Sequence, residues 1–336
     1  MSTPTVSVIV VSFDSAVWLT TCLDSVARDL QDEEWEAVVI ENATTSLDVT
    51  RALAVSHPRR VRVIQNDHNV GFACAVNQGL AATGGALVWI LNPDCAVLPG
   101  AFTALRAQAL EDGCGIVGPR VLNLDRSVQG SARGDPTMLT GLFGRSTLLT
   151  RLFPHSPVVQ KNIRTCQPIP AQAVVEVDWL SAACLVGRRK VLEEVGGFDE
   201  GYFLYWEDAD LCRRIRHRGY SVRYVSDATV IHAQGRSTRK VPRLAIRSFH
   251  ESAYRYYATH VARWPFGPGR LIARVALGLR CRWKLWRVVR RSDRVASGDS
   301  RPALDLIRPF AGRPRWQPAD GPDTSGPTAS QSQSSA

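Results

Sequence analysis

The chain has 336 residues, a mass of 37.0 kDa and a net charge of +10, and 45% of its residues are hydrophobic. That length is sufficient for one large α/β domain or two smaller ones with a buried core. The eight cysteines form no CxxC pair and no regular spacing, which argues against a disulfide framework or a structural zinc site. The apolar run at residues 6–11 is too short for a signal peptide or a membrane span, so we expect a reduced, cytoplasmic setting.

The positive charge is concentrated near the C-terminus. Residues 236–294 contain sixteen Lys or Arg and two acids, a local net charge of +14 that leaves −4 for the rest of the chain. The basic character therefore belongs to the tail, and the front of the chain is mildly acidic.

The first hundred residues alternate strand and helix patterns. Short β-branched apolar runs at 6–11, 36–40, 61–64 and 86–91 are typical of buried parallel strands, and helical patterns lie between them at 15–28, 46–56 and 72–82. This alternation predicts an α/β fold with a Rossmann-like, mostly parallel central sheet flanked by helices. Ligands of such sheets bind beyond the carboxyl ends of the strands, so the residues that follow each run are the first candidates.

The rest of the chain predicts a more mixed architecture. Residues 120–173 are rich in proline and predict loops that cross the surface or cover a site. Strand patterns return at 174–186, a short helix follows at 188–195, and a strand pair is predicted at 221–225 and 228–233. We expect a catalytic domain over 1–240, a basic helical extension over 241–296 and a disordered tail over 297–336.

The sheet lacks the usual phosphate-binding loops. There is no GxGxxG after the first strand and no GxxxxGK[ST] in the chain, so a bound diphosphate needs another source of positive charge. Asn92 and Asp94 follow the fourth predicted strand and offer an amide and a carboxylate oxygen to a cation such as Mg²⁺ or Mn²⁺. Taken alone, Asn-Pro-Asp is also good turn chemistry, and the turn interpretation stays open.

Other polar residues lie where a ligand could contact them. Glu41 ends the second predicted strand and could bind a base or ribose, although solvent explains an exposed acid equally well. Asn69 precedes a predicted helix, where capping is the simplest explanation. Asn77 lies inside that helix at a cost in helix propensity, which favours a specific contact.

The segment FLYWEDADLCRR contains three acids at the start of a predicted helix over 208–218. Asp210 faces arginines three and four positions further on, so a surface pairing accounts for it. One of Glu207 and Asp208 is enough to cap the helix and to interact favourably with the helix dipole. The other is surplus to that role and is a candidate for chemistry.

His232 ends the last predicted strand. A single histidine at a strand end is more often structural or solvated than a metal ligand. Its interpretation depends on whether Asp94 lies close to it.

Together these segments resemble the family 2 glycosyltransferases, and among them the bacterial rhamnosyltransferases that extend polyprenyl-diphosphate-linked glycans. The resemblance covers about residues 6–238 and rests on the segments VSVIVVSFDS, ENAT, NVGFACAVNQGLAATGG, LNPDCAVLPGAF, VDWLSAACLVGRRKVLEEVGGFDEGYFLYWEDADLCRRIRHRGY and ATVIHAQGRST. It implies a GT-A fold and an inverting, metal-dependent transfer of a sugar, L-rhamnose from dTDP-L-rhamnose, to a polyprenyl-diphosphate-linked saccharide in cell-envelope polysaccharide synthesis.

The resemblance also implies roles for individual residues. Asp208 matches the catalytic base, and Asp94 and His232 match the ligands of Mg²⁺ or Mn²⁺. Donor binding is implied for Ser12, Glu41, Asn69, Asn77, Asn92 and Asp94, and acceptor binding for Trp179, Ser181 and Glu207. Two residues depart from the family pattern, Glu41 in place of Asp and Ala182 in place of Gly, and they bear on nucleotide preference and on the width of the acceptor pocket.

Two other classes of function remain open. A sugar nucleotidyltransferase shares this type of sheet, but the glycine- and arginine-rich loop that such enzymes carry after the first strand is absent from VVSFDSAVWL. A non-catalytic adaptor that uses the basic tail to bind a membrane or nucleic acid is the second alternative.

The basic tail predicts an amphipathic helix. Leu271, Val275, Leu279, Trp283 and Trp286 recur at helical spacing among Arg and Lys residues. Such a helix suits the surface of an anionic membrane, which predicts a protein peripheral to the inner face of the cell membrane. The alternative is a helix that packs on the catalytic domain through its tryptophans. Nucleic acid is not expected as a partner, because no recognised binding motif accompanies the charge.

Overall fold

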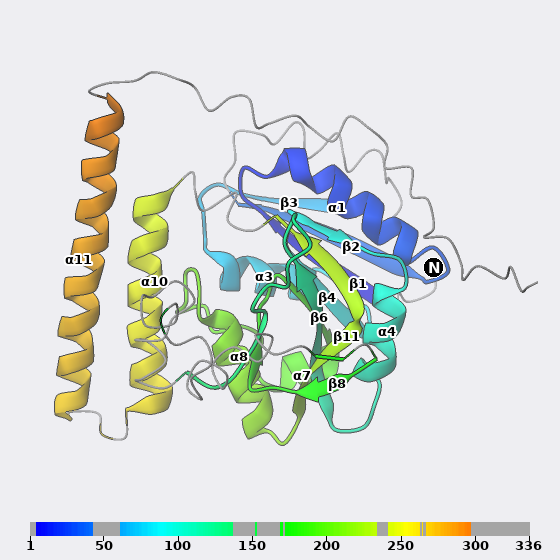
Figure 1. Ribbon diagram of the computed structural model, residues 1–336. Coiled ribbons are helices and arrows are strands. Elements are labelled where there is room, and N and C mark those ends of the chain that lie inside the picture. The colour runs from blue at the N-terminus through cyan, green and yellow to red at the C-terminus, as the bar shows by residue number, and fades with distance from the viewer. Residues whose placement is uncertain are drawn as a thin grey trace, which may run out of the picture. The chain divides into compact units, whose positions relative to one another are not determined.

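The structure is a computed structural model, and it describes residues 5–42, 61–136, 152, 169–170, 172–233, 241–262, 264 and 267–296. The chain divides into two units, Met1–Val289 and Arg290–Ala336, and the fold and the site lie in the first. That unit is built around a nine-stranded sheet with the order β3-β2-β1-β4-β10-β6-β11-β5, in which β8 also pairs with β11 (Figure 1).

The sheet is parallel on one side and mixed on the other. Strands β3, β2, β1 and β4 run parallel, β10 is antiparallel to both β4 and β6, and β11 is parallel to β6 and antiparallel to β5. The strands of this sheet are β1 Val6–Ser12, β2 Trp35–Asn42, β3 Val61–Asn66, β4 Leu87–Leu91, β5 Cys95–Val97, β6 Cys114–Leu122, β8 Val174–Glu176, β10 Cys184–Arg188 and β11 Ser221–His232. A separate two-stranded sheet joins β7 Ala132–Arg133 to β9 Trp179–Leu180.

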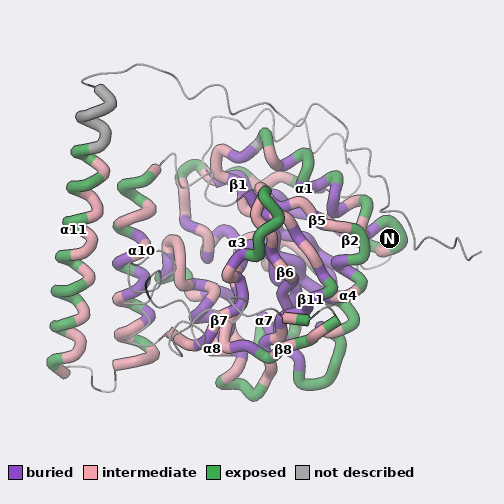
Figure 2. Tube along the Cα trace, in the orientation of Figure 1, coloured by how far each residue is buried: buried purple, intermediate pink, exposed green. Residues whose placement is uncertain are grey.

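Helices cover both faces of the sheet, so its strands are buried on both sides (Figure 2). One core contains α1 and α4, with Leu19 and Phe102 packed against Val8 and Trp89 of the sheet. The other core contains α3, α7 and α8 on the opposite face. The helices in these layers are α1 Ala16–Asp29, α3 Phe72–Ala81, α4 Ala101–Ala109, α7 Arg189–Glu194 and α8 Glu207–His217. Burial on both faces is why these strands read as continuous apolar runs.

The sequence predictions hold for the first four strands and for helices α1, α3, α7 and α8, to within one or two residues at most ends. The predicted helix at 46–56, most of the predicted loops between 120 and 173, and the tail beyond 296 lie outside the described residues. The predicted strand pair at 221–225 and 228–233 was wrong, because one strand, β11, runs from Ser221 to His232. Its register with β6 shifts between Val225 and Thr229, so a bulge interrupts the apolar pattern without a turn.

Beyond the sheet the chain forms helix α10 (Pro242–Tyr256), the π-helical turn η3 (Tyr257–Val261) and helix α11 (Pro268–Ala296). Figure 1 shows α10 and α11 side by side, and side-chain contacts between them include the Lys284 amine 5.7 Å from the Phe249 ring and the Arg274 guanidinium 5.7 Å from the Tyr254 ring. Within the described part of the chain, no helix combines the length and the hydropathy needed to cross a bilayer.

Candidate active site

The polar residues predicted to bind the donor gather at the carboxyl edge of the parallel strands. Ser12 ends β1 and is paired in register with Glu41 of β2, and Asn92 follows β4 on the other side of β1. Ser12 and Glu41 are almost fully buried, and the Ser12 hydroxyl has no protein partner. A buried hydroxyl without a partner costs free energy unless a ligand or water completes it.

Asn69 belongs to a ladder of side-chain amides that runs from β2 to α3. Its Oδ1 accepts hydrogen bonds from Asn42 Nδ2 (2.9 Å) and from the Gly71 N–H (2.9 Å), and Asn66 donates to Asn42 Oδ1 (3.2 Å). The capping interpretation of Asn69 was wrong, because α3 begins at Phe72, its N-cap is Gly71 at φ 88°, and it has no side-chain cap. Asn69 instead fixes the loop that leads into the helix.

Asn77 contacts the segment ahead of the acidic cluster. Its side-chain amide exchanges two hydrogen bonds with the backbone of Phe198, both 2.9 Å, and donates a third to Glu200 (2.9 Å). The specific contact expected for an asparagine inside a helix is therefore present, and it joins α3 to the loop before α8. The predicted contact of Asn77 with the donor stays a prediction.

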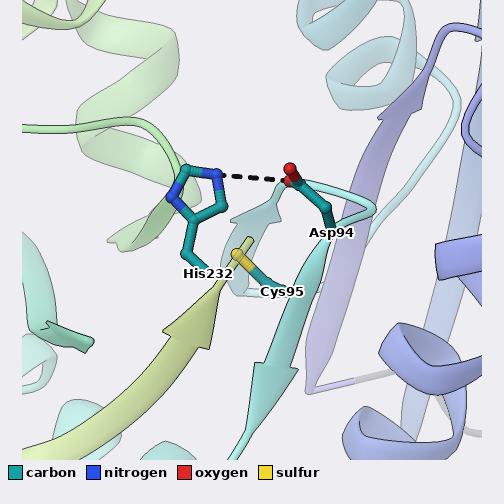
Figure 3. A group of neighbouring side chains, drawn as sticks. All are labelled: Asp94, Cys95 and His232. Carbon is teal, nitrogen blue, oxygen red and sulfur yellow. Dashed lines mark ion pairs between the residues drawn. The ribbon is translucent and has the colours of Figure 1, made fainter. Parts of the chain in front are cut away.

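Asp94 and His232 form one corner of the site, which we call the metal corner. The Asp94 Oδ1 lies 3.2 Å from the His232 Nε2, and the two side chains are only 9% and 8% exposed (Figure 3). The Asn92 amide lies 3.4 Å from the same nitrogen. Gln129 contacts the other side of the histidine. Its Oε1 lies 3.1 Å from the His232 Nδ1, and its own Nε2 donates to the His232 carbonyl at 2.8 Å.

These residues fit a divalent cation. When His232 Nδ1 donates its proton to Gln129, Nε2 presents a lone pair to the Asp94 carboxylate, so two acceptor atoms face each other at 3.2 Å. A cation between them satisfies both, and a ligating histidine normally has its other nitrogen fixed in this way. The structure therefore brings together the two residues whose proximity the metal prediction required.

Glu207 and Asp208 form a second corner, which we call the base corner. They open α8 directly after Tyr205 and Trp206, which both have left-handed backbone conformations at φ 69° and 72°. The Asp208 carboxylate accepts hydrogen bonds from the N–H groups of Ala182 (3.2 Å) and Ala209 (2.8 Å). Glu207 is buried, and its Oε2 has no protein partner.

The two neighbouring acids differ in proton affinity. Burial, and next the adjacent charge of Asp208, raise the pKa of Glu207 well above its ordinary value of 4.5. Burial also raises the pKa of Asp208, but the hydrogen bonds from Ala182 and Ala209 offset part of that rise. The rise in pKa is therefore larger for Glu207 than for Asp208.

Asp210 is not the surface residue that the sequence predicted. It is 1% exposed, and it binds Arg214 Nε at 2.7 Å and His260 Nε2 at 2.6 Å. Burial alone would raise its pKa, but the hydrogen bond from His260 and the charge of Arg214 lower the pKa below its ordinary value of 3.8. The prediction missed this because His260 lies fifty residues further along the chain.

Residues 181–183 join the two corners. The Ala182 N–H donates to Asp208, and the next residue, Ala183, offers its carbonyl to the Asn92 N–H at 2.9 Å and to the Cys95 thiol at 3.3 Å. Ser181 and Trp179, the predicted acceptor residues, belong to the same segment. The Trp179 indole donates to the Gly134 carbonyl at 3.0 Å.

Two further groups that the sequence did not reveal support the base corner. The guanidinium of Arg216 binds Asp178 (3.3 Å) and Asp135, and it ties β9 and the segment after β7 to α8. The Trp206 ring packs against the rings of Phe249 and Tyr256 of α10, with distances between ring centroids of 5.9 Å and 5.3 Å. Each pairing joins distant segments, so no local pattern could predict it.

Comparisons with known proteins agree with this architecture. A family model described as "Glycosyltransferase like family 2" matches residues 4–267. The N-acetylglucosaminyl-diphospho-decaprenol L-rhamnosyltransferase of Mycobacterium tuberculosis is 33% identical over 261 residues, which cover 74% of this chain and 83% of that protein. The rhamnosyltransferase WbbL of Escherichia coli is 34% identical over 93 residues, 27% of this chain and 35% of that protein.

Among solved structures, a mannosyltransferase from Pyrobaculum calidifontis, PcManGT in complex with GDP-Man and Mn²⁺, matches with a TM-score of 0.51. The sequences are 19% identical, and the match covers 91% of this chain and 79% of that one. This likeness establishes the predicted fold, GT-A. With that fold, and with a family match over most of its length, the chain belongs to the family 2 glycosyltransferases.

Proposed function

We propose that this glycosyltransferase is inverting and metal-dependent, and that it transfers L-rhamnose from dTDP-L-rhamnose to a polyprenyl-diphosphate-linked saccharide in cell-envelope polysaccharide synthesis. The names of the Mycobacterium tuberculosis and Escherichia coli relatives, both rhamnosyltransferases, support the sugar, and the first of those names supports the lipid-linked acceptor. Family membership favours this activity over a nucleotidyltransferase or an adaptor.

The observation that carries the proposal is the hydrogen-bonded connection through residues 182 and 183. Consecutive backbone groups bind the Asp208 carboxylate on one side and the Asn92 N–H on the other. A transferase needs a base and a leaving-group site at a fixed separation, because the acceptor oxygen must approach the sugar carbon from the side opposite the departing diphosphate. The hydrogen bonds of residues 182 and 183 connect the two positions directly, which supports the proposal.

Asp208 is proposed as the general base. A sugar hydroxyl is a poor nucleophile, so a carboxylate must take its proton as the new bond forms. The two N–H groups that bind Asp208 fix its orientation and lower its pKa, which opposes the rise that burial causes. Inversion requires one displacement, and these residues supply its base without a covalent nucleophile.

Asp94 and His232, with the Asn92 amide beside them, would hold Mg²⁺ or Mn²⁺. When bound, the cation supplies Lewis-acid stabilisation of the negative charge that develops on the leaving diphosphate. Gln129 fixes the orientation of the His232 ring for this role.

The remaining predicted residues divide between donor and acceptor. The carboxyl edge of β1 to β3 carries Ser12, Glu41 and Asn69, which are proposed to contact the nucleoside. Asn77, on α3, is proposed to contact the donor as well. Glu207 precedes Asp208, Trp179 and Ser181 belong to the segment whose Ala182 N–H binds it, and all three are proposed to contact the acceptor.

Helix α11 is proposed to rest on an anionic membrane surface. Its apolar residues at one face are at least half exposed, with Leu271 at 66%, Leu279 at 64%, Trp283 at 52% and Trp286 at 50%. Residues 268–290 contain seven Arg or Lys and no acid. Two contacts of α11 with α10 involve the basic side chains Arg274 and Lys284, and apolar residues beside a cationic surface suit an anionic membrane.

A nucleotide-sugar panel tests the transfer. Purified protein is incubated with Mg²⁺ or Mn²⁺ and each of several nucleotide sugars, and donor hydrolysis and thermal stabilisation are recorded. We expect dTDP-L-rhamnose to give the largest response and chelation of the metal to abolish it. Equal responses to all donors, or a response that survives chelation, would contradict the donor or the metal assignment respectively.

Vesicle co-sedimentation tests the membrane surface. Full-length protein should sediment with phosphatidylglycerol vesicles and remain in solution with phosphatidylcholine vesicles. Replacement of both Trp283 and Trp286 by Ser should weaken sedimentation, and the matched control is Val17→Ser, which changes an exposed apolar residue on α1. Sedimentation that is unchanged in the double variant would remove the proposed role of α11.

A further inference from the structure

The metal corner contains a third metal-binding group, Cys95, which the proposed transfer does not use. Cys95 on β5 and His232 on β11 are directly opposite each other in an antiparallel pair, so their side chains rise from the same face of the sheet. The Cys95 sulfur, an Asp94 carboxylate oxygen and a His232 ring nitrogen all lie within 4.8 Å of one another (Figure 3). No other three His, Cys, Asp or Glu side chains in the described ranges converge in this way.

We propose that Asp94, Cys95 and His232 form a binding site for a thiophilic divalent cation, and that Zn²⁺ is the ion that fits it. The ion would be bound by a carboxylate oxygen, a thiolate sulfur and an imidazole nitrogen. The site overlaps the position proposed for Mg²⁺ or Mn²⁺, so the two kinds of cation compete. The proposal concerns metal binding and is independent of which sugar or acceptor the enzyme uses.

The chemistry of the three groups separates the two kinds of cation. Mg²⁺ favours octahedral sites whose ligands are mostly oxygen, and it gains nothing from a sulfur ligand. Zn²⁺ prefers four ligands drawn from sulfur, nitrogen and oxygen, and three protein ligands leave its fourth position open. A thiolate and a carboxylate together balance the two charges of the ion. As the sulfur–zinc bond forms, the thiol proton passes to solvent, so no oxidant or reductant takes part.

The local structure prepares the site in two further ways. Gln129 binds His232 Nδ1 and thereby leaves Nε2 facing Asp94. The Cys95 thiol donates to the Ala183 carbonyl at 3.3 Å, and cation binding would replace this hydrogen bond with the bond from sulfur to the metal. Cys95 and His232 are both buried, and in such a water-poor corner a bound cation interacts strongly with the charged ligands.

The ordinary alternative is that Cys95 is a small apolar core residue. Cys22 and Cys184 show that environment, because they lie in the same core cluster as Cys95. Cys22 donates to the Asn92 carbonyl and Cys184 accepts the Trp89 indole N–H. Neither belongs to the Asp94–Cys95–His232 group, so they serve as matched controls.

Co²⁺ titration of the full-length protein provides the direct test. Co²⁺ substitutes for Zn²⁺ in such sites, and a thiolate ligand gives it a near-ultraviolet charge-transfer band. We expect the wild-type protein to develop that band, Cys95→Ser and Cys95→Ala to lose it, and Cys184→Ser to keep it. The melting transition of each variant confirms that it folds. A band that survives in both Cys95 variants, or no band in wild-type protein that binds Co²⁺, would overturn the proposal.

Calorimetric titration with Zn²⁺ and, separately, Mn²⁺ gives a second measure of selectivity. Even a residue that only orients a ligand contributes about 10–100-fold to metal affinity, so the loss of the sulfur should weaken Zn²⁺ binding by at least about tenfold more than Mn²⁺ binding. Equal losses for both ions in Cys95→Ser would contradict the role of the sulfur. Absence of transfer activity would defeat the proposed function and leave this comparison intact.

Discussion

The metal corner and the base corner are held in place by different parts of the molecule. Asp94 and His232 lie at the ends of strand segments, and β5 and β11 are hydrogen-bonded to each other at these residues. Glu207 and Asp208 begin a helix, and their position depends on α10 and η3, which come later in the chain. The main chain of the sheet thus builds one corner, whereas side-chain packing builds the other.

This difference has an energetic consequence. Tyr205 and Trp206 both occupy the left-handed region, which costs about 1–3 kcal/mol for each such residue. The Phe249 ring contacts both of their rings, and Ser252 donates to the Leu204 carbonyl at 3.0 Å. These contacts with α10 offset the strain, so we expect the base corner to be the more easily disturbed of the two.

Loss of the metal corner should give the largest effect. A Lewis acid stabilises the transition state by several kcal/mol, so Asp94→Ala should reduce the transfer rate by about a thousandfold. The dissociation constant of the nucleotide sugar, measured with and without Mn²⁺, should respond to the metal in the wild-type protein and not in the variant. Asp67→Ala, which changes an exposed acid after β3, is the control. A variant whose donor binding still depends on Mn²⁺ would show that Asp94 is not a ligand.

Loss of a side chain that supports the base corner, without any change to Glu207 or Asp208, should mainly reduce stability. His260→Ala removes one partner of the buried Asp210, which costs about 3 kcal/mol, because Arg214 still pairs with the acid. Urea unfolding measures this loss. His217→Ala, at the exposed C-terminal end of α8, should have little effect. Equal stability of the two variants would mean that η3 does not support the base corner.

Gln129 tests the metal corner without touching the ligands themselves. Gln129→Ala leaves His232 Nδ1 without its partner, and such changes reduce metal affinity by about 10–100-fold. Calorimetric titration with Mn²⁺ measures the effect, and Ser127→Ala, at an exposed position two residues earlier, is the control. Unchanged affinity in Gln129→Ala would separate this residue from the metal corner.

The smallest expected effects concern the pH dependence of stability. Variants of two acids in the first turn of α8 should change it in opposite directions. The folded state lowers the pKa of Asp210 below 3.8, so its interactions stabilise the protein at neutral pH and are lost as the pH falls through the folded pKa. Asp210→Asn should therefore be destabilising at neutral pH, with a difference from wild type that shrinks in acid.

Glu207 should behave in the reverse way. The folded state raises its pKa above 4.5, so the cost of keeping its proton is absent below that pH and grows as the pH rises toward the folded value. Glu207→Gln should therefore stabilise the protein at neutral pH, with a gain that disappears near pH 4.5. Melting temperatures of both variants across this range check the two signs, and parallel curves would contradict the assignment of the protonated acid.

The sequence predicted the metal corner better than the base corner. Buried parallel strands show continuous apolar runs, and their carboxyl ends converge on one edge, so Glu41, Asn92 and Asp94 could be placed from local pattern. The pairing of Asp94 with His232 followed from the family resemblance, and the structure confirms their proximity at 3.2 Å.

The supports of the base corner could not be predicted because they involve residues far apart in sequence. Asp210 and His260 are separated by fifty residues, and neither helical spacing nor composition indicates that they meet. The bulge in β11 also escaped prediction, because an interrupted apolar pattern is typical of a turn as well. Local rules describe single elements, and tertiary pairings decide between the alternatives that those rules leave.

The most direct test of the account is the transfer rate of Asp208→Asn, with donor affinity measured on the same preparation. General-base catalysis contributes about 10²–10⁴-fold, so we expect the rate to fall by at least a hundredfold while the dissociation constant of the nucleotide sugar stays at the wild-type value. A rate within a few-fold of wild type would contradict the assignment of Asp208 as the base, and with it the division of the site into two corners.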